Sequence, residues 1–255
     1  MAAWNRISWG DLFTLANGIL GFIAITYILD REFVSAIGLL LVSTMMDGLD
    51  GYIARKFGSK HSMGQVLDSI SDSISFAFAP ALLIYAEFHR STNSVPENLL
   101  VLACAIAILG CGLFRLARFS ARGYQLSYFV GMPAPAAALF IVLICLLFGS
   151  SDGAEDPKFY FVLAETMWLV LGAGILASFL MASEIPYPKI EGWMTALSGL
   201  AILLAVIPYT AGLLLVDDQT LYRTFSRTAT SIALAFTAVY VFGGPVYAKV
   251  KGIHS

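Results

Sequence analysis

Long apolar runs separated by short polar connections make up most of the chain. A helix needs roughly 20 mostly apolar residues to cross the hydrocarbon core of a bilayer. Eight runs are long and apolar enough, and they cover residues 12–29, 33–55, 66–86, 97–117, 133–149, 159–182, 194–216 and 229–248. The connections leave no room for a separate soluble domain. The pattern predicts an all-α, polytopic membrane protein with about eight transmembrane helices in one domain, residues 1–255.

The composition agrees with a membrane protein. The chain is 58% hydrophobic and 13% charged, whereas a soluble domain carries about 25% charged residues. It has no basic block of the kind that binds nucleic acid, so we expect no nucleic-acid partner. Three cysteines lie inside apolar runs, where packing is a better explanation than disulfide bonding. The first apolar run lacks a cleavage signal of small residues, so we expect it to be retained.

Positive charge is distributed unequally between the two ends of the predicted helices. When the helices alternate in direction, ten of the 15 Lys and Arg residues fall on the side of the chain termini and five on the other side. The other side also carries an acidic loop at residues 150–156. Because cytoplasmic loops carry an excess of Lys and Arg, we expect a multi-pass protein of the cell membrane with both termini in the cytoplasm.

Four aspartates interrupt the apolar pattern where the second run meets the third. Asp47 and Asp50 are three residues apart, and Asp68 follows after a short turn. Asp72 lies four residues beyond Asp68, so each pair shares one helical face. Fourteen residues of the runs lie on the far side of each pair, which is about 21 Å of helix. In a core about 30 Å thick, the pairs should meet at equal depth in the cytoplasmic third, with the two helices as antiparallel neighbours.

Four carboxylates this close need a compensating cation or protonation in a low-dielectric site. Oxygen ligands suit Mg²⁺, Mn²⁺ or Ca²⁺, and the single nearby histidine, His61, argues against zinc. Two ions about 3.5–4 Å apart could clamp a diphosphate. Gly51 and Gly64 leave space for a ligand beside the carboxylates, although glycines also allow close helix packing. Polar residues at a wet helix end are the plainer alternative for the aspartates, and the matched depth of two pairs argues against it.

The spacing around these aspartates resembles the signature of the CDP-alcohol phosphotransferase family. The sequence reads Asp47-x2-Asp50-Gly51-x2-Ala54-Arg55, then eight residues, then Gly64-x3-Asp68-x3-Asp72. This pattern matches the signature without departure. The resemblance implies a membrane enzyme that moves a substituted phosphoryl group from a CDP-alcohol to an acceptor hydroxyl and releases CMP.

The resemblance also implies roles for individual residues. The four aspartates would ligate Mg²⁺ or Mn²⁺, as two ions, and Asp72 would also be the general base that takes the acceptor's proton. The CDP group would be bound at the remaining signature positions, which are Gly51, Ala54, Arg55 and Gly64. Asn17, in the first apolar run, could bind the nucleotide or metal-site water, or could form a hydrogen bond between helices.

Family members are commonly homodimers with a six-helix catalytic core. The resemblance therefore implies a homodimer whose core lies within residues 1–190, with two additional helices in residues 191–255.

Further segments resemble the phosphatidylserine synthase branch of this family. Residues 68–81 read D-S-I-S-D-S-I-S-F-A-F-A-P-A, close to that branch's D-S-L-A-D-x-x-S-F-G-x-A-P-A, with Ala77 where glycine is usual. Residues 115–119 match its R-L-A-R-F, and residues 131–137 and 183–189 are similar to two of its loops. The resemblance implies L-serine as the acceptor and CDP-diacylglycerol or CDP-archaeol as the lipid donor.

Arg115 and Arg118 are the candidate acceptor-binding residues. They are three residues apart at a helix end, so their side chains can share one face. Arginine suits bidentate capture of a carboxylate, and anchoring at lipid headgroups is the alternative. Glycerol phosphate or inositol phosphate remains possible as the acceptor. A divalent-cation transporter is the alternative of another class, but its carboxylates would be expected to continue along a path through other helices.

Overall fold

The structure is a computed structural model that describes residues 9–57, 62–90, 93–122, 128–148, 166–188, 219–250 and 252. Its elements in chain order are α1 (Trp9–Leu29), α2 (Phe33–Phe57), α3 (Ser62–Asp72), the π-helix η2 (Ser73–Phe78), α4 (Ala79–Phe88), α5 (Val95–Arg122), β1 (Tyr128–Val130), α6 (Ala134–Phe148), α7 (Met167–Ala182), β2 (Pro186–Pro188) and α9 (Gln219–Val250). The helical class is confirmed, with one short two-stranded ribbon that the apolar pattern does not predict.

Seven of the eight predicted runs overlap described helices. The run at 194–216 and residues 159–165 of the run at 159–182 lie outside the described residues. Four helical segments are long and apolar enough to cross a bilayer, which indicates an integral membrane protein; they are Gly10–Leu29, Met63–Phe88, Val95–Ala121 and Ser226–Val250. Shorter apolar helices cover Phe33–Leu49, Ala134–Phe148 and Met167–Ala182. The count of eight transmembrane helices therefore stays a prediction.

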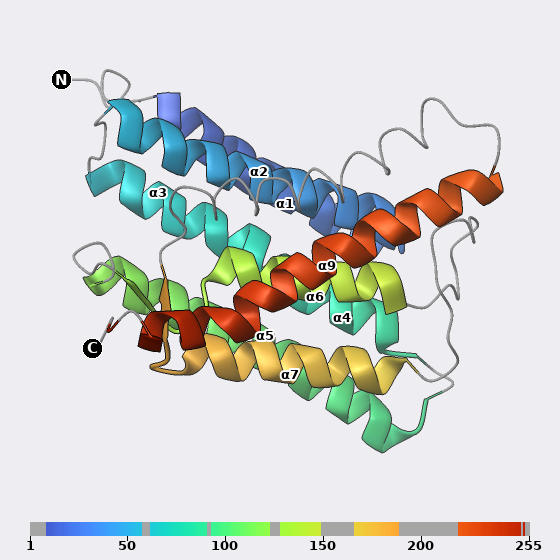
Figure 1. The fold of residues 1–255 in the computed structure, drawn as a ribbon. Helices are drawn as coiled ribbons and strands as arrows, with labels where there is room; N and C mark the ends of the chain where they lie inside the picture. The colour runs from blue at the N-terminus through green and yellow to red at the C-terminus, as the bar shows by residue number, and fades with distance from the viewer. Residues whose placement is uncertain are drawn as a thin grey trace.

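The helices pack around α6, whose residues from Ala137 to Leu147 are all buried. A helix that is apolar on every side belongs at the centre of a bundle. α6 contacts α2, α7 and α9, while α5 packs against α4 and α7. In Figure 1, α9 crosses in front of α6 and reaches the ribbon at the end where α3 begins.

Helix α1 packs against both of the helices that carry the aspartates. Its main neighbours are α2 on one side and α3, η2 and α4 on the other. The expectation that the second and third helices are direct neighbours is thus met only in part, because both make their larger contacts with α1. A Cβ atom at Gly18 would lie 2.9 Å from Ser71 Oγ, and one at Gly21 would overlap Ser75. The two glycines therefore let α1 approach the aspartate-bearing helix closely.

The helix formed by α3, η2 and α4 changes its winding directly after Asp72. In the π-helix η2, the Ala79 N–H donates to the carbonyl of Ile74, five residues earlier. Pro80 follows at the start of α4 and, having no N–H, cannot donate to the preceding turn. Single π turns inside α-helices are frequent at functional sites. Here the turn lies between the aspartates and the apolar half of the helix.

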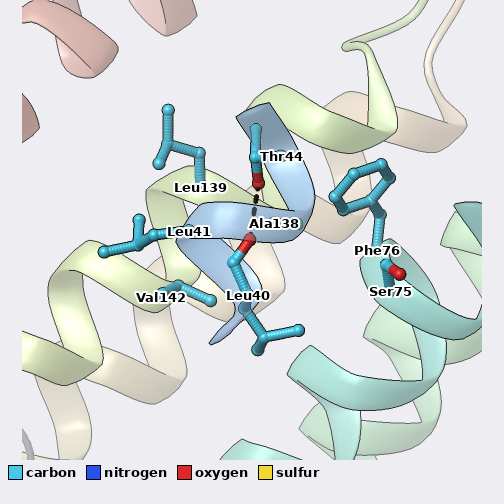
Figure 2. A pocket seen from close by; sticks show the side chains of 8 residues that line it. All are labelled: Leu40, Leu41, Thr44, Ser75, Phe76, Ala138, Leu139 and Val142. Carbon is cyan, nitrogen blue, oxygen red and sulfur yellow. Dashed lines mark hydrogen bonds between the residues drawn. The ribbon is translucent and has the colours of Figure 1, made fainter. Parts of the chain in front are cut away.

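The packing between α2, η2 and α6 is tight next to the aspartate end. A gap between these elements is lined by Leu40, Leu41, Thr44, Ser75, Phe76, Ala138, Leu139 and Val142 and is too small to admit a water molecule (Figure 2). The Thr44 hydroxyl, the one polar group of α2 in this lining, donates to the Leu40 carbonyl at 2.9 Å within its own helix. This part of the interior is therefore closed to water.

The ribbon joins the segment before α6 to the segment after α7. β1 and β2 pair antiparallel, with Phe129 opposite Tyr187 and prolines at both ends of β2. Proline cannot donate to a ladder and is confined to strand edges and ends, which limits the ribbon to two short strands. The ribbon lies at the end of the bundle where α5 finishes (Figure 1).

Candidate active site

Three carboxylates converge at one end of the bundle. α2 contributes Asp47, and α3 contributes Asp68 and Asp72. One oxygen of each side chain lies within 4.8 Å of the others. Asp72 is buried, and the other two are half-buried. The convergence expected from the spacing is thus observed for three of the four aspartates. The side chain of Asp50, one turn further along α2, lies outside the described residues.

Asn17 fixes the most deeply buried of these carboxylates. Its Nδ2 donates to Asp72 Oδ1 at 3.0 Å. Ser43 on α2 donates to the Asn17 side-chain oxygen, and Ser75 on η2 donates to the Asn17 backbone carbonyl at 3.0 Å. All three supporting side chains are fully buried. Of the roles considered for Asn17, the structure shows the hydrogen bond between helices, and nucleotide binding stays a prediction.

The donor set fits a hard divalent cation. Carboxylate oxygens are the ligands that Mg²⁺ and Mn²⁺ prefer in proteins. Three carboxylates within 4.8 Å repel one another unless a cation compensates them. A Cβ atom at Gly48, next to Asp47, would meet none of its described neighbours within 4 Å. The three residues therefore could hold a metal ion.

The other signature positions lie at the same end of the bundle. Gly51 lies one turn after Asp47 on α2 and is half-buried, and Gly64 lies near the start of α3 and is half-buried. Ala54 and Arg55 lie on the last turns of α2, and their side chains are outside the described residues. Their contact with CDP stays a prediction.

Arg115 on α5 is the cation beside the carboxylate cluster. It is only 4% exposed, and Asp72 and Asp47 are its acidic electrostatic neighbours. Its guanidinium carbon lies 5.0 Å from the ring centre of Phe119 and 5.5 Å from that of Phe129. Within the part of the chain that the structure describes, its N–H groups make no hydrogen bond. A buried guanidinium held by aromatic rings is suited to binding an anionic ligand.

Arg118, one turn further along α5, has a different environment. Its guanidinium donates to four backbone carbonyls, those of Val130 at 2.7 Å, Met181 and Ser183 at 3.0 Å and Ala182 at 3.3 Å. These bonds join the end of α5 to β1 and to the C-terminal end of α7. They favour a structural role over the expected contact with the acceptor, because they occupy the donors that an acceptor carboxylate would need.

Sequence reasoning did not find Ser43, Ser75 or Tyr240 as parts of the site. Ser43 lies four residues before Asp47, so the shared helical face was an available signal. Ser75 lies across the π turn from Asp72, where the ordinary helical period does not apply. Tyr240 on α9 is an electrostatic neighbour of Arg115, and nothing in the spacing of the sequence connects these two residues.

Comparison with known proteins agrees with this geometry. Residues 8–176 match the CDP-alcohol phosphatidyltransferase family. A CDP-diacylglycerol–serine O-phosphatidyltransferase of Methanocaldococcus jannaschii is 36% identical over 183 residues, which cover 72% of this chain and 75% of that protein. A protein of the same name from Helicobacter pylori is 35% identical over 71% of this chain and 72% of its own length. The archaetidylserine synthase of Methanothermobacter thermautotrophicus is 34% identical over 73% of this chain and 72% of its own length.

The chain therefore belongs to the CDP-alcohol phosphatidyltransferase family and is a membrane-bound transferase of phospholipid biosynthesis. The family expected from the spacing of the aspartates is confirmed. Its relatives with these names occur in both archaea and bacteria.

Proposed function

We propose that this protein transfers the phosphatidyl or archaetidyl group of a CDP-diradylglycerol to the hydroxyl of L-serine and releases CMP. The observation that carries the proposal is the buried Arg115 guanidinium, whose acidic electrostatic neighbours are Asp72 and Asp47 of the cluster. Serine carries a carboxylate, which is the kind of anion that a guanidinium binds. The names of the relatives in archaea and bacteria support the same acceptor.

In the proposed mechanism, Asp72 takes the proton of the serine hydroxyl. The Asn17 amide donates to Oδ1 of this carboxylate at 3.0 Å and so fixes its position. The serine oxygen then forms a bond to the lipid-side phosphorus, and the bond from that phosphorus to the CMP oxygen breaks. Phosphoryl transfer depends mainly on positioning and charge neutralisation. A base within hydrogen-bond reach of the acceptor supplies the remaining requirement.

The aspartates hold the cofactor in this proposal. Asp47, Asp50, Asp68 and Asp72 ligate two ions of Mg²⁺ or Mn²⁺. When bound, these ions supply positive charge for the diphosphate and the departing CMP. Gly51, Ala54, Arg55 and Gly64 line the site of the CDP group at the end of α2 and the start of α3. Arg115 binds the serine carboxylate and sets the orientation of the hydroxyl.

The proposal extends to the surroundings of the protein. The charge distribution supports both termini and the active site on the cytoplasmic side of the cell membrane, with eight spanning helices in a single domain. The family resemblance supports a homodimer and a six-helix core within residues 1–190, with two added helices in 191–255.

Acceptor competition with the purified protein tests this function. CDP-diacylglycerol or CDP-archaeol is incubated with Mg²⁺ or Mn²⁺ and with labelled L-serine, glycerol phosphate or inositol phosphate. We expect label in the lipid product from serine alone, with one CMP released for each serine incorporated. Incorporation of another acceptor would contradict the serine assignment. Metal flux into sealed vesicles without CMP release would instead indicate a divalent-cation transporter.

A further inference from the structure

Arg115 lies in an enclosure that the ribbon and the last helix complete. In an antiparallel pair, residues opposite each other project on the same face, and Phe129 lies opposite Tyr187. On this face Phe129 contacts the Arg115 guanidinium at 5.5 Å. Tyr187 contacts the ring of Tyr240 on α9, with ring centres 5.9 Å apart. One face of the ribbon therefore touches the site arginine at one position and α9 at the opposite position.

Two tyrosine hydroxyl groups form hydrogen bonds between the ribbon and α9. The Tyr187 hydroxyl donates to the carbonyl of Val241 at 3.0 Å, and the Tyr240 hydroxyl donates to the carbonyl of Pro188 at 3.2 Å. These bonds run in opposite directions, so each element supplies one donor and one acceptor. A Cβ atom at Gly244 would lie 3.1 Å from the Tyr187 ring, which shows how closely α9 approaches. Burial raises the pKa of Tyr187 to about 12, so its hydroxyl remains a donor at neutral pH.

The opposite strand is fixed separately. Arg118 donates to the Val130 carbonyl at 2.7 Å and to carbonyls at the end of α7. Gly131 follows with φ of 77°, and a Cβ atom there would lie 2.5 Å from the Arg118 guanidinium. β1 is thus held by α5, and β2 is held by α9. Phe129, whose ring lies against Arg115, therefore belongs to a ribbon that is attached to both α5 and α9.

We propose that Tyr240 and Tyr187 are positioning residues for the acceptor, through which α9 sets the place of Arg115 by holding the β1–β2 ribbon. This inference rests on the proposed role of Arg115 as the acceptor-binding cation. It gives a function to α9, which lies beyond residue 176, where the family match ends. In this proposal the helix is a part of the acceptor site, while the metal residues lie on α2 and α3.

Steady-state kinetics of the full-length protein test this role through Tyr240→Phe and Tyr187→Phe. Each variant keeps the aromatic ring and removes one hydrogen bond to a backbone carbonyl. We expect each to raise the KM for serine about threefold to tenfold. The KM for CDP-diacylglycerol and the activation by Mg²⁺ should stay within about twofold of the wild-type values, because the aspartates are untouched. Tyr27→Phe, an exposed tyrosine at the far end of α1, is the matched control and should change neither KM.

A merely structural role predicts a different pattern. Loss of packing alone would lower kcat or the unfolding temperature and leave the two KM values unchanged or raised together, and that result would overturn the inference. Should wild-type protein use glycerol phosphate rather than serine, the proposed acceptor fails. The same comparison of KM values with glycerol phosphate would then still test α9, because an anionic acceptor also binds through Arg115.

Discussion

Replacement of Asn17 by alanine tests how Asp72 is held. The amide donates to a carboxylate at 3.0 Å, and both residues are buried. A hydrogen bond to a charged group contributes about 1.5–3 kcal/mol. If Asn17 holds Asp72 in its reactive position, the loss of this bond should lower kcat by about tenfold to 150-fold. The KM for the CDP-lipid should change little, because Asn17 is bonded to Asp72 and to serines of α2 and η2.

The assay is CMP release from CDP-diacylglycerol at saturating serine and Mg²⁺. Ser43→Ala removes the bond that fixes the Asn17 amide, and since it is a neutral bond of about 0.5–1.5 kcal/mol we expect about a twofold to tenfold decrease in kcat. Thr26→Val on α1 removes a hydroxyl that donates to the Ile23 carbonyl within its own helix and should leave kcat unchanged.

Two results would refute this reasoning. Unchanged kcat in Asn17→Ala would show that Asp72 needs no support from α1. A rise in the KM for the CDP-lipid at constant kcat would show that Asn17 binds the nucleotide, which is the other role that the sequence left open.

Three further predictions concern charge, packing and metal. Arg115→Lys should raise the KM for serine about tenfold or more because it loses the planar guanidinium. Arg118→Lys should chiefly lower the unfolding temperature because it breaks bonds to four carbonyls. Equal kinetic effects of the two variants would contradict their separate roles. Gly18→Ala should destabilise the fold by about 1–3 kcal/mol through overpacking against Ser71, as measured by thermal unfolding in detergent. The control Gly172→Ala, whose Cβ meets open space, should not destabilise it. Equal unfolding temperatures of the two variants would count against the close contact of α1. Removal of divalent metal by EDTA should abolish CMP release, and Mg²⁺ or Mn²⁺ should restore it; turnover in the chelated protein would exclude the metal role of the aspartates.

The convergence of the aspartates was predictable because it depends on two regular features. Helical periodicity puts Asp68 and Asp72 on one face. The short connection after α2 brings this pair back to the end of the bundle where Asp47 lies. The sequence could not reveal that α1 is the main neighbour of both helices. That arrangement depends on the contacts of Gly18 and Gly21, and a glycine pattern has several explanations.

Other parts of the site depend on contacts between distant segments. Asn17 and Asp72 are 55 residues apart, and no local period connects them. The π turn after Asp72 changes the hydrogen-bond partner of each residue without changing the apolar composition of the helix. Strand β2 contains two prolines in three residues, a pattern that argues against a strand. The different roles of Arg115 and Arg118 likewise arise from the carbonyls that the fold brings to only one of them.

The measurement that tests the central claim most directly compares wild-type protein with Asp72→Asn for metal-dependent CMP release from the CDP-lipid in the presence of L-serine. The wild-type protein should release one CMP for each serine incorporated, and only with Mg²⁺ or Mn²⁺ present. The variant should still bind the CDP-lipid but release no CMP, because the amide cannot take the hydroxyl proton. Full turnover by Asp72→Asn, or CMP release by the wild type without metal, would contradict the account.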